Sequence, residues 1–319
     1  ANPVLAAGEL GLETDTQRFK IGNGSTAWNS IDAYGFSPTA PTVTYTETTE
    51  PTAEAGTVVT YTSGVGGRLM PKFIGPAGMS SALQPFLARN KIGYWAPPGS
   101  ATTIPAVFGY AALTMVGTAT ARAVTTANMF TRTRRLGFVS AATANALASA
   151  RMAAAQVTLG DGTLGGFHKV VRFAISDAVV VSGARMFVGV SSNISAPTNV
   201  EPSTLTNGIG VGHGAADTNL KLYYGGSAAQ TPIDLGANFP SNTTNTDFYE
   251  LALFAPPSGG IKYEVVRLNT GHVATGTLSA AGGVALPAAT TLLTPMWAYR
   301  TNNATAAAVG LDLVSDYFE

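Results

Sequence analysis

The sequence predicts an all-β protein whose main body is an antiparallel β-sandwich or jelly roll. From residue 160 onward, apolar and polar residues alternate over short segments, which is the period of a half-buried strand. Segments rich in Gly, Pro and Asn separate these runs, as the turns of an antiparallel sheet require. No strand–helix–strand alternation is present, which argues against a nucleotide-binding fold.

Composition narrows the function classes. The 319 residues carry 18 Lys and Arg against 18 Asp and Glu, and only 11% are charged. Broad nucleic-acid binding is excluded, because it needs many phosphate-neutralising cations. The lack of cysteine excludes disulfides, thiolate metal sites and a cysteine nucleophile. No run approaches the roughly 18 apolar residues of a membrane span, so we expect no membrane insertion, and we expect no cofactor or metal.

Residues 1–36 form the first segment, which we expect to be a hairpin module. Glu9–Glu13 and Arg18–Ile21 are the expected strands, and Gly22–Gly24 is an expected tight turn. A lone two-stranded hairpin is marginally stable in water. We therefore expect the module to pack against another protein surface through its apolar residues, Leu10, Leu12, Phe19, Ile21 and Trp28.

The stretch from Pro3 to Asn29, PVLAAGELGLETDTQRFKIGNGSTAWN, resembles the short module of bacteriophage tail-fibre and tropism-determinant proteins. The resemblance implies an adaptor and not a chemical site. It also implies a place in the virion, which we expect to be the tail-fibre tip. The lack of cysteine fits assembly in the reducing host cytoplasm. The implied partners are upstream fibre-shaft or baseplate proteins.

Residues 37–66 read as a Thr/Pro/Gly-rich connector, and 67–159 as a shoulder or neck region. In the connector, Gly56–Gly64 is an expected strand. Prolines at 71, 76, 85, 97, 98 and 105 exclude a long helix in the neck. There, only Ser80–Asn90 looks helical, and Lys91–Trp95 is an expected strand.

Two further segments of the neck leave alternatives open. In Thr131–Phe138, Arg132 and Arg134 would share one face of a strand, where they could contact an acidic sugar or phosphate or simply be solvated. The alanine-rich stretch Ser140–Gln156 has high helix propensity but no apolar stripe of helical period, so helix and extended chain both fit.

Residues 160–319 are the expected sandwich tip. The expected strands are Phe167–Ile175, Ala184–Val190, Leu220–Tyr224, Asp247–Ala255, Ile261–Leu268, Met296–Arg300 and Val309–Glu319. Through the segments 165–173, 184–190, 233–240, 247–257 and 292–303, this half resembles, more loosely, the lectin-like distal tip domains of phage tail fibres. That resemblance implies a homotrimer that recognises a bacterial surface polysaccharide, either lipopolysaccharide or capsule.

Motifs for catalysis are absent from the sequence. The G-x-G spacing in Gly208–Gly214 is not followed by the helix that a phosphate cradle needs. The three histidines lie too far apart for a local zinc motif, and the carboxylates are scattered. We therefore expect no enzyme. A tailspike-like polysaccharide depolymerase and a purely structural fibre segment are the alternatives.

Carbohydrate binding needs aromatic faces and polar groups that match hydroxyls. The candidates beside predicted turns are Tyr223, Tyr224, Trp297, Tyr299 and Arg300, together with His213, Asp217 and Asn219 on one loop that could face a ligand or a cation. Since neighbours in a strand point to opposite faces, about half of the aromatic candidates should belong to the core.

Overall fold

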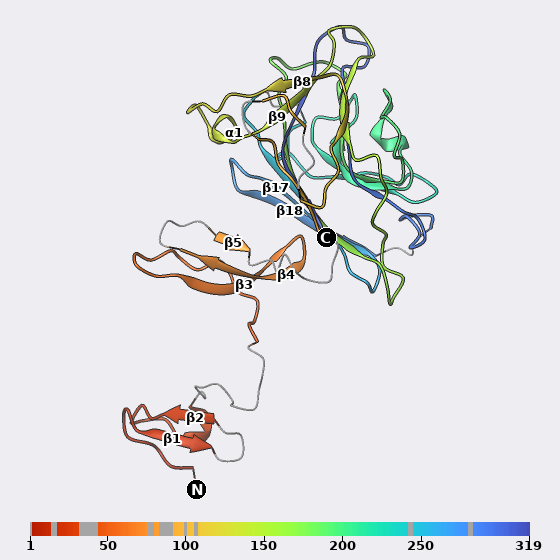
Figure 1. The fold of residues 1–319 in the computed structure, drawn as a ribbon. Coiled ribbons are helices and arrows are strands. Elements are labelled where there is room, and N and C mark those ends of the chain that lie inside the picture. Colours follow the sequence, from red (N-terminus) through yellow and green to blue (C-terminus); the bar gives the residue numbers. More distant parts are fainter. Residues whose placement is uncertain are drawn as a thin grey trace.

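Two antiparallel sheets face each other and make up most of the molecule. The computed structural model describes residues 2–13, 18–31, 44–75, 80–82, 92–98, 101–104, 108–241, 245–279 and 283–319. Helix within these ranges is confined to α1 (Met129–Arg132) and two single 3-10 turns, Trp28–Ser30 and Pro202–Thr204. The predicted all-β, antiparallel sandwich is therefore confirmed (Figure 1).

In the described ranges one sheet has seven strands and the other has eight. The seven-stranded sheet runs β15 (Ile233–Asp234), β14 (Lys221–Gly225), β13 (Gly208–His213), β12 (Arg185–Ser191), β19 (Thr294–Thr301), β10 (Leu147–Arg151) and β7 (Thr114–Val116). The eight-stranded sheet runs β18 (His272–Leu278), β17 (Ile261–Arg267), β16 (Tyr249–Ala255), β11 (Phe167–Ile175), β20 (Gly310–Phe318), β9 (Leu136–Val139) and β8 (Thr118–Ala121), and β6 (Gly93–Trp95) also pairs with β20. The seven strands expected after residue 160 are all present, with ends shifted by a few residues.

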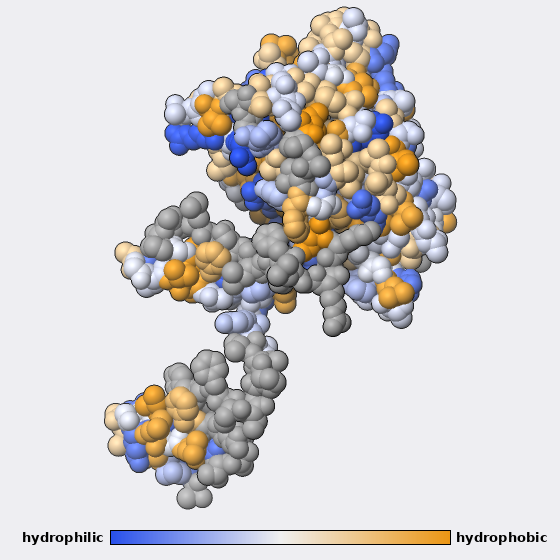
Figure 2. All heavy atoms as spheres, in the orientation of Figure 1, coloured by the Kyte–Doolittle hydropathy of each residue, from blue (hydrophilic) through white to orange (hydrophobic). Residues whose placement is uncertain are grey.

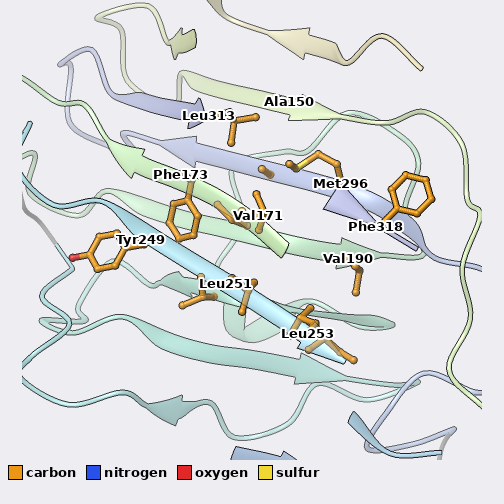
Figure 3. Packing of buried hydrophobic residues seen from close by; sticks show 14 of the residues in the cluster. Ala150, Val171, Phe173, Val190, Tyr249, Leu251, Leu253, Met296, Leu313 and Phe318 are labelled. Atoms are coloured by element: carbon orange, nitrogen blue, oxygen red, sulfur yellow. The ribbon is translucent and has the colours of Figure 1, made fainter. Parts of the chain in front are cut away.

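The main core lies between the two sheets. Val171 and Leu251 of the eight-stranded sheet belong to the same buried cluster as Val188 and Met296 of the seven-stranded sheet. Figure 3 shows how such side chains from both sheets gather in one layer. The alternation in the sequence thus predicts the inward face correctly. Each large aliphatic side chain buried there contributes about 1.5–3 kcal/mol of hydrophobic free energy.

The sandwich extends on the N-terminal side beyond the boundary expected at residue 160. In the 67–159 region, β9 pairs with β20 and β10 pairs with β19. The alanine-rich stretch supplies β10, and its Ala148 and Ala150 are fully buried. The small side chains are accommodated inside a sheet between β19 and β7, so tertiary pairing overrides their helix propensity.

Two local expectations in the neck are wrong. Arg132 ends helix α1, whose start is capped by the Asn128 side chain accepting the Thr131 N–H at 2.8 Å, so Arg132 and Arg134 do not share a strand. Ser80–Ala82 is not the start of a helix; it forms strand β5 and pairs with β4. The rest of the expected helix, 83–90, lies outside the described residues. The strand expected at Lys91–Trp95 is present as β6, Gly93–Trp95.

A hairpin of β3 (Val59–Val65) and β4 (Arg68–Ile74) rests its tip on the outer face of the eight-stranded sheet. The tip residues Gly66 and Gly67 have φ of 58° and 81°. A Cβ added to Gly66 would lie 2.7 Å from the Cβ of Ala252, so only glycine permits this approach. Figure 1 shows the hairpin beside β17 and β18, with the C-terminus next to β4.

The N-terminal module contains the two predicted strands, β1 (Leu10–Glu13) and β2 (Arg18–Ile21), paired antiparallel. Lys20 bridges the module's parts: its Nζ lies 2.8 Å from Glu13 Oε1 and 5.1 Å from the centre of the Trp28 ring. Leu10 and Leu12 are 67% and 66% exposed. Figure 2 shows the resulting apolar surface on this module.

Candidate functional site

Three of the predicted aromatic residues belong to a buried cluster and not to an open face. Tyr223, Trp297 and Tyr299 pack with Phe187 in a cluster separate from the main core. The segment 192–207 lies over them: Trp297 Nε1 donates to the Ser195 carbonyl at 3.0 Å, and the Tyr299 hydroxyl donates to the Val200 carbonyl at 3.0 Å. The expectation that these rings are open to a sugar is therefore corrected. These three rings lie on the face of the seven-stranded sheet that points away from the main core. The segment 192–207 covers that face and buries them.

His213 and Arg300 are also buried. Arg300 Nη1 lies 2.8 Å from His213 Nε2, and Arg300 Nε donates to Asp177 Oδ2 at 3.0 Å. Burial, and then the nearby Arg300 charge, lower the pKa of His213 to about 3, so its imidazole is neutral at pH 7. Both residues belong to an internal polar network and do not face solvent, which corrects the expectation that His213, on a loop, and Arg300, beside a turn, would face a ligand.

Asp217, Asn219 and Tyr224 are the predicted site residues that keep partial exposure. Asp217 Oδ2 accepts from the Tyr223 hydroxyl at 2.5 Å, and Asp217 Oδ1 pairs with Lys221 Nζ at 2.6 Å. Burial opposes ionisation of Asp217, yet these hydrogen bonds lower its pKa overall. Asn219 Nδ2 donates to Asp234 Oδ1 at 3.0 Å. Asp217 and Asn219 thus form a polar edge, whereas Tyr224 packs against the main core.

A different constellation lies on the outer face of the eight-stranded sheet. His168 and Glu319 are opposed on adjacent strands through reciprocal backbone hydrogen bonds of 3.1 and 2.9 Å. Directly opposed residues of an antiparallel pair project from the same face. Phe254 is the opposite neighbour of His168 on β16, with ring centroids 5.9 Å apart. We call the group Arg68, His168, Phe254, Tyr317 and Glu319 the outer-face site.

Arg68, at the tip of the β3–β4 hairpin, connects the polar members of this site. Its Nη2 donates to Glu319 Oε1 at 2.5 Å, and its Nη1 lies 3.4 Å from His168 Nδ1. The Tyr317 hydroxyl donates to the other Glu319 oxygen. The hydrogen bond with Glu319 raises the pKa of Arg68 above its ordinary value. A docked hairpin therefore completes the site.

A cavity of about 450 Å³ opens at the outer-face site. Arg68, His168, Phe254 and Glu319 line it, together with the segment 156–158 and other residues. Tyr94 on β6, outside the residues that line this cavity, is the register partner of Tyr317 and is 38% exposed. The cavity volume lies in the range of small-ligand pockets.

His168 is a neutral hydrogen-bonding group in this site. It is 2% exposed, and burial, followed by the Arg68 charge, lowers its pKa to about 4. Its Nε2 has no hydrogen-bond partner among the described residues. A neutral imidazole, a guanidinium and a carboxylate supply both donors and acceptors, the set that a hydroxyl-rich ligand can match.

The sequence contains no local pattern that marks the outer-face site. Arg68 and Glu319 are 251 residues apart. His168 is visible only as a polar residue on the outward face of the strand Phe167–Ile175. In the described ranges no three His, Asp or Glu side chains come together in a group that could hold a metal ion. No helix in those ranges has the length and apolar character to cross a membrane.

The fold defines an antiparallel β-sandwich protein, and the N-terminal module is the part with a recognised family. Residues 1–26 match the family model of the major tropism determinant N-terminal domain. The chain therefore begins with a phage tail-fibre-type module, as the sequence predicts. No curated protein matches the chain.

Several solved structures share a loose likeness with the sandwich. A protein of unknown function from Shewanella oneidensis is 14% identical and covers 71% of this chain and 84% of its own, with a TM-score of 0.46. Peanut lectin in complex with a 9mer peptide is 8% identical, with coverages of 72% and 97% and a TM-score of 0.46. Arcelin-5, a lectin-like defence protein from Phaseolus vulgaris, is 12% identical, with coverages of 72% and 98% and a TM-score of 0.44.

Proposed function

We propose that this chain is a receptor-binding protein of a phage tail fibre and that its outer-face site binds a bacterial surface glycan, lipopolysaccharide or capsule, during adsorption. The carrying observation is the tropism-determinant module at residues 1–26 in one chain with a β-sandwich that presents this cavity. In this proposal the chain is part of the virion and binds the glycan without cleaving it.

The chemistry of the site suits a sugar. A guanidinium held by a carboxylate presents fixed N–H donors, and the Nε2–H of a neutral His168 whose Nδ1 faces Arg68 is a further donor, while the Glu319 oxygens accept. Tyr94 presents an open ring on which sugar C–H groups can stack. Such contacts are weak one by one, so repeated sites on a fibre would raise the overall avidity.

The N-terminal module supports the proposed homotrimer and the fibre-shaft or baseplate partners. Its exposed Leu10, Leu12 and Ile21 leave an apolar face on a hairpin that would be marginal alone. Two further copies of the same module are the proposed cover for this face. A trimer would also supply the threefold repetition of the glycan site.

Binding and competition together test the proposal. Purified protein should bind host surface polysaccharide in calorimetry and should reduce adsorption of the corresponding phage when added in excess. The matched variants are Arg68→Gln in the site and Arg134→Gln at an exposed position outside it. Unaltered phage adsorption at saturating protein, with no heat of binding, would favour the purely structural fibre segment and reject the proposal.

A depolymerase is the second candidate function because of Glu264. Burial, and then the neighbouring Glu250, raise the pKa of Glu264, which is the property of a general acid. Glu264 and Glu47 line a cavity of about 370 Å³ beneath the β3–β4 hairpin. Release of oligosaccharide from host polysaccharide, abolished by Glu264→Gln, would establish this function in place of binding alone.

A further inference from the structure

Lys169, Asp316 and Tyr110 form a polar triad that is sealed inside the sandwich. Lys169 and Asp316 are fully buried, and Tyr110 is nearly so. The Lys169 amine contacts Asp316 Oδ1, and the Tyr110 hydroxyl donates to Asp316 Oδ2. The two reactive side chains come from adjacent strands, since Val171 of β11 is the register partner of Asp316 of β20.

The surroundings of the triad are apolar. The Phe318 ring packs edge-on against Tyr110 at 5.5 Å, and the inward neighbours of Lys169 on β11 are Phe167 and Val171. An ion pair in such surroundings loses its hydration, and the Coulomb attraction repays this only in part. Burial accordingly lowers the pKa of Lys169 and raises the pKa of Asp316. Both directions favour a neutral amine beside a neutral carboxylic acid.

We propose that Lys169 and Asp316 join in an intramolecular isopeptide bond, an amide between Lys169 Nζ and Asp316 Cγ, with Tyr110 as the group that promotes its formation. Contact between Nζ and Oδ1 also places the amine within reach of Cγ, to which Oδ1 is bonded. Holding nucleophile and electrophile at such a separation can replace a large part of the barrier to a bimolecular reaction.

The step balances without any other reactant. The lone pair of the neutral Nζ attacks Cγ of the protonated carboxyl group, and the new C–N bond gives a tetrahedral intermediate. The Tyr110 hydroxyl stabilises the negative charge that develops on Oδ2. One proton of Nζ passes to the hydroxyl on Oδ1, the C–Oδ1 bond breaks, and one water leaves. The core then keeps an amide in place of two ionisable groups.

The bond would tie together strands that are distant in the chain. Lys169 and Asp316 are 147 residues apart, and β11 and β20 are central in the eight-stranded sheet. The crosslink would close a loop over about half of the protein and would hold the two central strands in register. A covalent tie of this kind suits a protein that acts outside a cell without disulfides.

Mass spectrometry of the unaltered full chain tests the proposal. The intact mass should fall short of the sequence mass by one water, about 18 Da. After trypsin, residues 152–172 should appear joined to residues 301–319, with Lys169 uncleaved. An intact mass equal to the sequence mass, with both peptides found separate, would overturn the proposal.

Three variants identify the groups. Lys169→Arg keeps a positive charge but cannot form the amide, so its mass deficit should disappear, whereas the exposed Lys262→Arg should keep it. Tyr110→Phe keeps the ring and should give a mixture of joined and separate chains shortly after synthesis. A deficit that persists in Lys169→Arg would place the lost water elsewhere, and complete joining in Tyr110→Phe would remove Tyr110 from the mechanism.

Discussion

Arg68 Nη2 lies 2.5 Å from Glu319 Oε1, so the first residue of β4 is ion-paired with the last residue of the chain. The pair fixes the tip of the β3–β4 hairpin over the end of β20. Because His168 faces the same pair, the β3–β4 hairpin and the sandwich jointly build the outer-face site.

Replacing Arg68 should weaken glycan binding without unfolding the sandwich. Arg68→Gln removes a charge-assisted hydrogen bond of the kind that contributes about 1.5–3 kcal/mol, and we expect affinity to fall roughly tenfold or more. Calorimetry with host polysaccharide measures the affinity, and thermal unfolding is the control. An unchanged affinity would show that the ligand does not engage this site.

Tyr94 should contribute to binding but little to stability. Its ring is partly exposed, so Tyr94→Ala should lower the free energy of unfolding by less than about 1 kcal/mol. Adsorption competition should need severalfold more of the variant protein. The matched control is Tyr45→Ala, another exposed tyrosine. Equal loss of competition in both variants would point to a general surface effect.

Trp297 should behave as a core residue. Its ring is buried and packs against Phe187 and Tyr299, at centroid distances of 5.8 and 5.5 Å. Trp297→Ala should lower the free energy of unfolding by about 3–5 kcal/mol. Denaturant unfolding measures this loss. If Trp297→Ala is as stable as the unaltered protein but no longer binds glycan, the prediction is wrong and Trp297 belongs to the binding site.

Stability should fall on acidification because of His168. In the folded state burial lowers the pKa of His168 from its ordinary value of 6.5 to about 4. Between these values the unfolded chain binds more protons, so this contribution is present above pH 6.5 and is lost as pH falls toward 4. The loss is on the order of 3 kcal/mol.

Chemical denaturation at pH 7 and pH 4.5 measures that contribution. His168→Gln should lose less stability between the two values than the unaltered protein does. The exposed His272→Gln should behave like the unaltered protein. Identical pH dependence in all three proteins would contradict the prediction.

Self-association should depend on the N-terminal module. We expect sedimentation of the chain to give a species near three times 32.6 kDa. Leu10→Ser with Leu12→Ser should shift the population toward the single chain, because the double substitution removes exposed apolar area from the proposed contact. A species near 32.6 kDa for the unaltered chain would reject the trimer.

Alternation of apolar residues predicted strands such as β11, β16 and β17 because side chains of a strand project to alternate faces. The same rule could not predict whether the outward face of the seven-stranded sheet is exposed to solvent. Trp297 lies on its outward face, yet the segment 192–207 covers it, and that contact joins residues about a hundred positions apart. A residue beside a predicted turn can therefore still be buried by a loop from elsewhere.

The N-terminal module, the all-β class and the inward face of most strands could be predicted from local pattern, because they depend on short-range geometry. Which polar groups meet depends on strand pairing between distant segments, so it is visible only in the folded chain. In the sequence, Lys169 is a single polar residue on an apolar strand face and Asp316 is one of many scattered acids. The pairing of β11 with β20 brings them together. Likewise Arg68, His168 and Glu319 converge through contacts that span the chain, and long-range pairing of this kind leaves no periodic trace in sequence.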